Sequence, residues 1–263
     1  MRPLFLALAL ATGCTFGDGR FTTGDASVDA DAASASDADA GDTLLGGCQG
    51  WWKFDDTSWT NGVTDSCGDD DRGTALAGAE LATDPARGSV ANITGGCIQV
   101  ADSPRLRFES AFTLSAWVNP RSTTDDQGII SKRNGFGDNS AFTTYLRKNA
   151  NQDFHLWVDV DTENDRFDLA DVTFALEWRH VTVVFDGTRI ANERVAIYVD
   201  GVFEDFGEES STALPPPTAP PPLSIGCLPN GGIPFDGYLD DAIVWNRALS
   251  TAEVASWFAR TTR

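Results

Sequence analysis

The chain has 263 residues and a formal net charge of −20, with 39 acidic against 19 basic side chains. Its length suits one large domain or at most two small ones. The acidic excess argues against nucleic acid as a partner, because binding to phosphates needs patches of Lys and Arg. It argues equally against charge-driven binding to anionic membrane surfaces.

The N-terminus has the pattern of an export signal. Arg2 precedes an apolar run from Leu4 to Leu10, which is too short to span a bilayer. Small residues and Cys14 follow, as in a bacterial lipobox, where the cysteine carries lipid. We predict that residues 1–14 are a lipoprotein signal and that Cys14 anchors the protein to the cell envelope, at the outer membrane or cell surface. The alternative is ordinary signal cleavage, with Cys14 incidental.

Residues 15–47 are rich in Asp, Ala, Ser, Gly and Thr and poor in apolar side chains. Such a segment cannot bury enough surface to offset the entropy lost on ordering. We therefore predict a disordered tether. A calcium-binding repeat is the alternative, but the glycine spacing that such repeats need is missing.

Four cysteines remain if Cys14 is lipidated, and an exported protein favours disulfides over free thiols. We expect Cys48–Cys67 to close the first loop of the folded part and Cys97–Cys227 to join two predicted strands. A zinc site is the competing use of these side chains. It is disfavoured because the chain has no Cys-x-x-Cys pair and only two histidines.

From Cys48 onward, aromatic residues and alternating patterns predict one folded domain, residues 48–263, made of many short strands. Trp51–Phe54 is the first strand, and Asp200-Gly201 marks a tight turn between Arg194–Asp200 and Val202–Phe206. Other strands are expected at 74–81, 97–100, 112–119, 127–132, 142–147, 153–160, 167–174 and 178–185. Short strands separated by turns favour a β-sandwich.

The chain ends with a strand and a helix. Ala242–Trp245 has no polar residue, so this strand should lie inside a sheet that is covered on both faces. We expect it to lie beside the first strand. Ser250 and Glu253 have the spacing of a capping box, which predicts the start of a helix.

Five segments in this order resemble a laminin-G-like domain with the concanavalin A-like fold: 112–120, 129–132, 178–187, 195–201 and 235–250. The resemblance implies an all-β fold, a two-sheet antiparallel jelly-roll sandwich, closed here by a short C-terminal helix. Members are mostly binding or adhesion modules, and many hold a structural calcium ion.

Calcium prefers six to eight oxygen ligands. Asp55 follows the first strand and Asp240 lies in the last, so the two carboxylates should converge if those strands are neighbours. The loop between Asp56 and Asp65 adds Asn61. We therefore consider Asp55, Asn61 and Asp240 as ligands of a structural Ca²⁺.

The alternative to a metal is that these carboxylates pair with Lys53, Arg247 or loop amides. Asp240 and Asp241 are adjacent in a strand, so they should point to opposite faces and at most one should bind a metal.

Exposed aromatic side chains are candidates for stacking on a ligand. Trp59 lies in a polar loop and Trp51 shares a face with Lys53, while Phe136 lies in a Gly-rich loop. We predict that these three line a binding edge, provided that Trp59 is substantially exposed.

Asp159, Asp161 and Glu163 alternate like the carboxylates of jelly-roll glycosidases. The segment runs into a polar turn, however, which favours a solvated hairpin tip. We assign no catalytic residue and predict a monomeric binding or adhesion module, not an enzyme, for a polysaccharide or a surface protein. The alternatives are a glycoside hydrolase that uses these three carboxylates, and a purely structural envelope protein.

Overall fold

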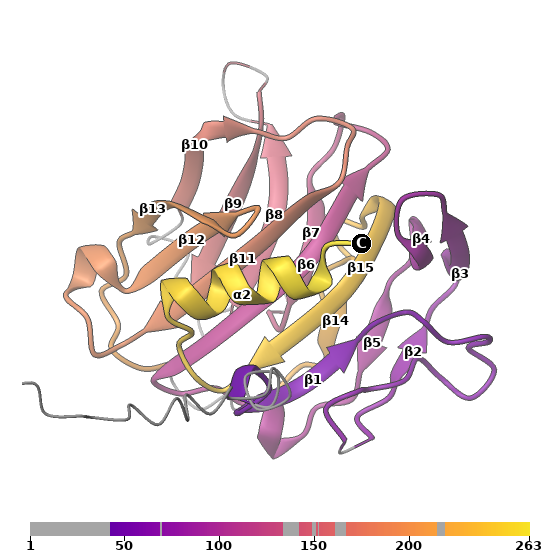
Figure 1. The fold of residues 1–263 in the computed structure, drawn as a ribbon, viewed down its shortest axis with the longest axis horizontal. Helices are drawn as coiled ribbons and strands as arrows, with labels where there is room; N and C mark the ends of the chain where they lie inside the picture. Colours follow the sequence, from indigo (N-terminus) through magenta and orange to yellow (C-terminus); the bar gives the residue numbers. More distant parts are fainter. Residues whose placement is uncertain are drawn as a thin grey trace, which may run out of the picture. The chain divides into compact units, whose positions relative to one another are not determined.

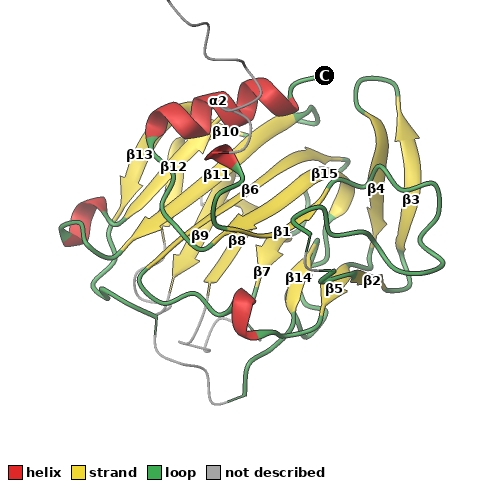
Figure 2. Ribbon diagram, turned by 60° about the horizontal axis from the view of Figure 1, so that its bottom comes forward, coloured by secondary structure: helices red, strands yellow, loops and turns green. Residues whose placement is uncertain are grey.

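The fold consists of two facing antiparallel sheets, with the helix α2 lying across the outer face of one (Figures 1 and 2). The computed structural model describes residues 43–68, 70–133, 142–148, 151, 153–160, 167–214 and 219–263. These residues belong to one compact unit. The predicted two-sheet sandwich with a short C-terminal helix is confirmed.

In the described part of the chain, the sheet beneath α2 has eight strands in the order β13-β12-β11-β6-β15-β4-β3, with β1 also paired to β15. Their bounds are β1 Cys48–Trp52, β3 Ala79–Asp84, β4 Gly88–Thr94, β6 Ala111–Pro120, β11 Arg179–Asp186, β12 Val195–Val199, β13 Val202–Gly207 and β15 Asp236–Trp245.

The facing sheet has seven strands among the described residues, in the order β10-β9-β8-β7-β14-β5-β2. Their bounds are β2 Gly73–Ala75, β5 Ile98–Val100, β7 Gln127–Ser131, β8 Phe142–Lys148, β9 Phe154–Val160, β10 Phe167–Thr173 and β14 Leu223–Ile225. The short helices η1 (Pro104–Leu106) and η3 (Ala191–Glu193) lie in connections.

The first and last strands are neighbours, as predicted. β1 pairs antiparallel with the second half of β15, with Trp52 opposite Ala242, and Figure 1 shows the two side by side. β15 is covered on both faces: Val244 packs in the core between the sheets, whereas Ile243 and Trp245 pack under α2. An all-apolar strand is stable here because neither face meets water.

The helix α2 (Thr251–Thr261) begins at the capping box that the sequence predicts. The Ser250 side chain accepts a hydrogen bond from the Glu253 N–H, and the Glu253 carboxylate accepts one from the Ser250 N–H. Such a cap contributes about 1 kcal/mol. Val254 and Trp257 are fully buried against the sheet, and the Trp257 ring makes edge contacts with other tryptophan rings. The apolar face of α2 therefore seals a second core on the outer side of the eight-stranded sheet.

One predicted strand, 74–81, is wrong. The structure divides it into β2 and β3, which belong to different sheets. Gly78 lies between them with φ +92°, and a Cβ there would meet the Thr94 carbonyl oxygen at 2.8 Å. The backbone turns at a position that only glycine fills without strain, so the alternating pattern on either side does not continue as one strand.

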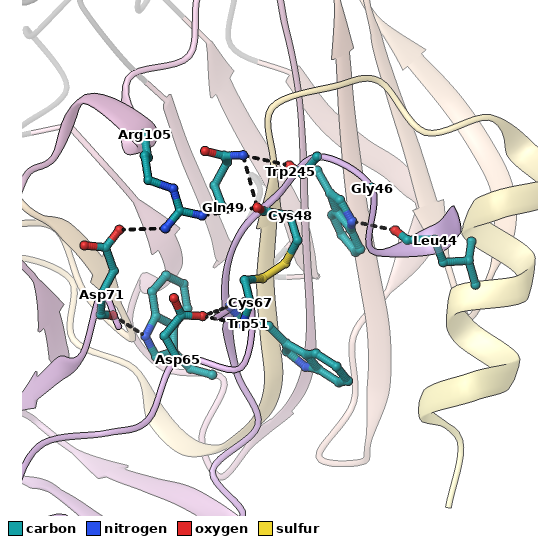
Figure 3. Close-up of a disulfide and its surroundings, with 12 residues drawn as sticks. Leu44, Gly46, Cys48, Gln49, Trp51, Asp65, Cys67, Asp71, Arg105 and Trp245 are labelled. Atoms are coloured by element: carbon teal, nitrogen blue, oxygen red, sulfur yellow. Dashed lines mark hydrogen bonds and ion pairs between the residues drawn. A yellow bond between two sulfur atoms is a disulfide. The ribbon is translucent and has the colours of Figure 1, made fainter. Parts of the chain in front are cut away.

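Both expected disulfides are present, Cys48–Cys67 and Cys97–Cys227. The first ties the start of β1 to the loop that follows it (Figure 3). In that loop one carboxylate oxygen of Asp65 accepts hydrogen bonds from the backbone N–H groups of Trp51 and Cys67, at 2.9 and 2.8 Å. The disulfide and this buried carboxylate together hold the loop against β1.

Candidate functional site

A cluster of buried charges lies where β15 changes partner. The first half of β15 pairs with β4 and the second half with β1, and the register against β6 shifts between Asp240 and Ile243. Asp241 adopts φ +46° at this bulge. Because the bulge interrupts the alternation of side chains, both carboxylates reach the same guanidinium. The prediction that Asp240 and Asp241 point to opposite faces is therefore wrong.

Arg87, in the turn between β3 and β4, supplies that guanidinium. Its Nε lies 2.7 Å from Asp240 Oδ2 and its Nη2 lies 3.0 Å from Asp241 Oδ2. Nη2 also donates to the carbonyl oxygen of Thr261 at the end of α2. The guanidinium lies 4.1 Å from the ring centre of Trp117, within range of a cation–π contact. Arg87 thus links the bulge of β15 to the helix, and all of its ion-pair partners are buried.

Asp55 and Asp240 do converge, but on a second arginine. Arg263 lies 3.2 Å from Asp55, 3.7 Å from Asp240 and 3.6 Å from Asp241. The carboxylates expected to bind calcium therefore form ion pairs with guanidinium groups, which was the alternative to a metal. The partners are Arg87 and Arg263, however, and not the predicted Lys53 and Arg247. Asn61 is exposed in the loop after β1. Among the described residues no group of three or more acidic, His or Cys side chains is arranged to hold a metal. This donor set does not fit Ca²⁺.

The cluster has three carboxylates and only two guanidinium groups. Burial and the neighbouring Asp241 carboxylate raise the pKa of Asp240 to about 7, although the Arg87 and Arg263 charges oppose the shift. Burial also raises the pKa of Asp241. A proton on Asp240 would balance the charge of the cluster. His180 lies on β11, which β6 separates from β15 in the sheet. Burial and the charge of Arg87 lower the pKa of His180 to about 3, so this imidazole stays neutral.

This pKa predicts how stability depends on pH. A folded-state pKa near 7 against an unfolded value of 3.8 means that the native protein binds the extra proton between these limits. The contribution of Asp240 to unfolding free energy therefore falls as pH rises from about 4 to 7, by up to about 1.4 kcal/mol per pH unit. Urea unfolding of wild type and Asp240→Asn should diverge by this slope between pH 5 and 7. Because both proteins contain His180, its titration cancels, and parallel pH profiles would contradict the assignment.

The aromatic residues chosen from the sequence do not form an exposed edge. Trp51 is 6 % exposed, and its indole N–H donates to Asp241, so its predicted exposure is wrong. Trp59 is only partly exposed and packs edge-on against Phe54. Phe136 lies outside the described residues. Polar neighbours in the sequence suggested solvent, but Trp51 packs against Trp257 of α2 and Trp59 packs against Phe54.

The carboxylates of the enzyme alternative are only partly described. Asp159 in β9 is fully buried and pairs with the equally buried Arg133, Oδ2 to Nη1, at 3.4 Å. Asp161 and Glu163 lie outside the described residues. The described member of this motif therefore belongs to a buried ion pair on the outer side of β9.

One open site that carries aromatic side chains is a groove between β13 and the start of α2, hereafter the α2–β13 groove. Its volume is about 620 Å³, within the range of small-ligand sites. Tyr198 of β12 lies on its floor, and Phe203 and Phe206 of β13 line its side. The Phe203 ring centre lies 5.6 Å from that of Tyr198 and 4.6 Å from that of Phe206, and 36 % of Phe203 is exposed.

A bulge in β13 places the two phenylalanines on one face. Phe206 lies opposite Ala196 and Phe203 opposite Tyr198, so the strand carries one extra residue between them. In a regular strand, residues three apart point to opposite faces. The hairpin turn before β13 also fits the predicted Asp200-Gly201 pair, with φ +51° and +75°, and a Cβ on Gly201 would meet Phe258 of α2 at 2.8 Å.

The rim of the groove carries charges of both signs. Arg189 lies 3.7 Å from Asp186 and 3.5 Å from Glu193, and the Arg194 guanidinium donates to the carbonyl oxygens of Glu209 and Ser210. Two acidic and two basic side chains therefore line the groove. None of the aromatic groove residues was singled out from the sequence, although Phe203 and Phe206 flank two acidic residues on a predicted strand.

The sequence of this chain matches a known protein family. Residues 92–255, more than half of the chain, match a laminin G family model described as the concanavalin A-like lectin/glucanases superfamily. The chain belongs to this family. The laminin-G-like resemblance expected from the five segments is confirmed. No curated protein matches the sequence.

Solved structures share this laminin-G-like fold at low sequence identity. One is domain 4 of AbnA, a GH43 extracellular arabinanase from Geobacillus stearothermophilus, in complex with arabinotriose. It is 18 % identical with a TM-score of 0.58, covering 82 % of this chain and 98 % of that one. At this identity the similarity establishes the fold alone.

Two others are toxin binding domains. That of Paraclostridial Mosquitocidal Protein 1 is 15 % identical with a TM-score of 0.57, covering 82 % of this chain. That of botulinum neurotoxin DC in complex with rat synaptotagmin II is 13 % identical with a TM-score of 0.56, covering 83 %. In both cases the match spans 52 % of the toxin domain, so this laminin-G-like chain corresponds to about half of each.

The disulfides of this laminin-G-like domain are typical of exported proteins. Cys14 and the segment 15–42 lie outside the described residues, so the lipid anchor and this part of the tether stay predictions. The predicted tether is wrong for residues 43–47, because Trp245 and Arg247 donate to the carbonyl oxygens of Leu44 and Gly46 and hold this segment on the domain. None of the helices in the described ranges has the length and apolar character needed to cross a membrane.

Proposed function

We propose that this laminin-G-like domain is a carbohydrate-binding module. The observation that carries the proposal is the α2–β13 groove, in which Phe203, Phe206 and Tyr198 meet charged side chains at one open site of about 620 Å³. Aromatic rings with a few polar groups around them suit a ligand that has both apolar C–H faces and hydroxyl groups. Sugars combine these two properties.

Part of the groove is built on β11, β12 and β13, and ladder hydrogen bonds fix the positions of these strands. Tyr198 is nearly buried, and its hydroxyl lies 3.1 Å from the hydroxyl of Thr251 in the first turn of α2. The floor and the helix side are therefore held in place before a ligand arrives. Such preorganisation reduces the entropy that binding must offset.

The arabinanase domain supports a carbohydrate ligand, because a domain of the same fold was solved with arabinotriose. The toxin binding domains support the broader class of exterior recognition modules. A protein ligand is the second outcome of these similarities. We favour carbohydrate because the groove, at about 620 Å³, is of small-ligand size and mixed in polarity, whereas a stable protein interface needs a larger surface.

We further propose that the domain is exported and held at the cell envelope by lipid on Cys14, with residues 15–42 as the tether. The acidic, apolar-poor composition of that segment and the two disulfides support this placement. Membrane fractionation of wild type and Cys14→Ser tests it, since the variant should move to the soluble fraction.

A screen of the full chain on a polysaccharide array tests the function. We expect binding to at least one glycan, without release of reducing sugars on incubation. Binding to no glycan would contradict the proposal, and release of sugars would instead favour the enzyme that Asp159, Asp161 and Glu163 suggest.

A further inference from the structure

We infer that the α2–β13 groove takes an uncharged saccharide chain, held by stacking on Phe203 and Phe206 and independent of any metal ion. This inference rests on the carbohydrate-binding function proposed above and names the ligand class and the residues that select it.

The aromatic side chains of the groove can stack on a ligand. Phe203 has 36 % of its surface exposed, although it is a large apolar side chain in a domain that buries most of its aromatic rings. The bulge in β13 puts Phe203 and Phe206 on one face, with ring centres 4.6 Å apart and ring planes tilted by 55°, and Phe203 meets the Tyr198 ring edge to face. Phe203 therefore offers an aromatic ring to a ligand that enters the groove. The apolar face of a sugar ring fits it.

The charges on the rim of the groove favour an uncharged ligand. Asp186 and Glu193 lie on either side of Arg189, and both pairs are partly exposed, so they offer hydrogen-bond donors and acceptors to hydroxyl groups. Arg194 is oriented by the Glu209 and Ser210 carbonyl oxygens. The rim has two acidic and two basic side chains, so it offers no excess of positive charge to offset the cost of desolvating a sulfate or carboxylate group.

The net charge of the whole molecule also favours an uncharged ligand. A net charge of −20 repels polyanions at long range. A uronate or sulfated chain would meet this repulsion, and the balanced charges of the groove rim would not offset it. An uncharged chain meets no such barrier, and its hydroxyl groups can use acceptors and donors alike.

The experiment compares neutral with anionic polysaccharides on the same protein. The full chain is titrated with arabinan, xylan, mannan and β-glucan, and with polygalacturonate and heparin, once with EDTA and once without it. We expect binding to a neutral polysaccharide that is little changed by salt, and at least tenfold weaker binding to both anionic ones.

Three variants locate the site. Phe203→Ala should weaken binding about tenfold, as loss of a central aromatic contact does. Phe203→Trp should keep it within about threefold, because the stacking surface remains. Leu176→Ala is the matched control, since Leu176 is a 60 % exposed apolar side chain outside the groove. Thermal melting of each variant shows whether it is folded.

The outcomes separate the inference from the function on which it rests. If a neutral glycan binds Phe203→Ala as tightly as wild type, the groove is not the binding site, but the proposed carbohydrate-binding function still holds. A preference for polygalacturonate or heparin, or binding only without EDTA, would overturn the ligand class. Failure to bind any polysaccharide would overturn the proposed function itself, and this inference with it.

Discussion

Replacing Arg87 by methionine should lower the free energy of unfolding by about 3–5 kcal/mol. The variant leaves Asp240 and Asp241 buried, at 0 % and 2 % exposure, without the guanidinium that contacts both carboxylates. It also leaves the Thr261 carbonyl oxygen at the end of α2 without that donor. Arg263 is farther away, at 3.6 to 3.7 Å, and compensates only in part. Urea unfolding measures the loss.

Arg121→Met is the matched control for this variant. Arg121 also pairs with an aspartate of β15, Asp236, at 2.6 Å, but both side chains are more than 40 % exposed. Its loss should cost less than about 1 kcal/mol, because solvent screens the pair. The double variant Arg87→Met/Asp240→Asn should recover part of the loss. Equal losses of unfolding free energy in the two arginine variants would show that burial does not increase the contribution of the Arg87 ion pairs to stability.

Removing the Cys97–Cys227 disulfide should cost more than removing Cys48–Cys67. The first closes a separation of 130 residues and the second one of 19. The chain-entropy relation gives about 5 kcal/mol for the longer loop and about 3 kcal/mol for the shorter. The longer bridge also ties the start of β5 to the end of β14, far apart in the chain.

Paired Cys→Ala variants of each bridge, unfolded in urea under non-reducing conditions, measure the two losses. Both members of a pair are replaced together, so that no free thiol remains. We expect the Cys97/Cys227 variant to unfold at the lower urea concentration. The reverse order would mean that Cys48–Cys67 stabilises chiefly the native loop of Figure 3, with its Asp65 hydrogen bonds, and not by restricting the unfolded chain.

Strand patterns predicted most of the fold because each reports on its own local surroundings. The run Ala242–Trp245 needs two covered faces, and the structure supplies the sheet core on one side and α2 on the other. Ser250 and Glu253 predicted the helix start through contacts three residues apart. The segment 74–81 failed because a glycine turn sends its halves to different sheets.

The candidate site could be predicted much less well. Trp51 and Trp59 were chosen for their polar neighbours in the sequence, but neighbours in the chain say little about what packs above a ring. Phe203 and Phe206 become one surface only through the bulge in β13. A bulge depends on the register that two strands reach together, which no single strand pattern encodes.

From its amino acids alone, this chain is recognisable as an acidic, disulfide-bonded β-sandwich, because hydrophobic alternation, turn residues and caps act over a few positions. Its resemblance to laminin-G-like domains rests on five segments in a fixed order. Only the tertiary structure decided that Arg87 and Arg263 neutralise the carboxylates expected to bind calcium, and that the exposed aromatic rings gather beside α2. Both outcomes depend on residues more than a hundred positions apart or on strand register. Such contacts are determined by packing of the whole domain, not by local preference.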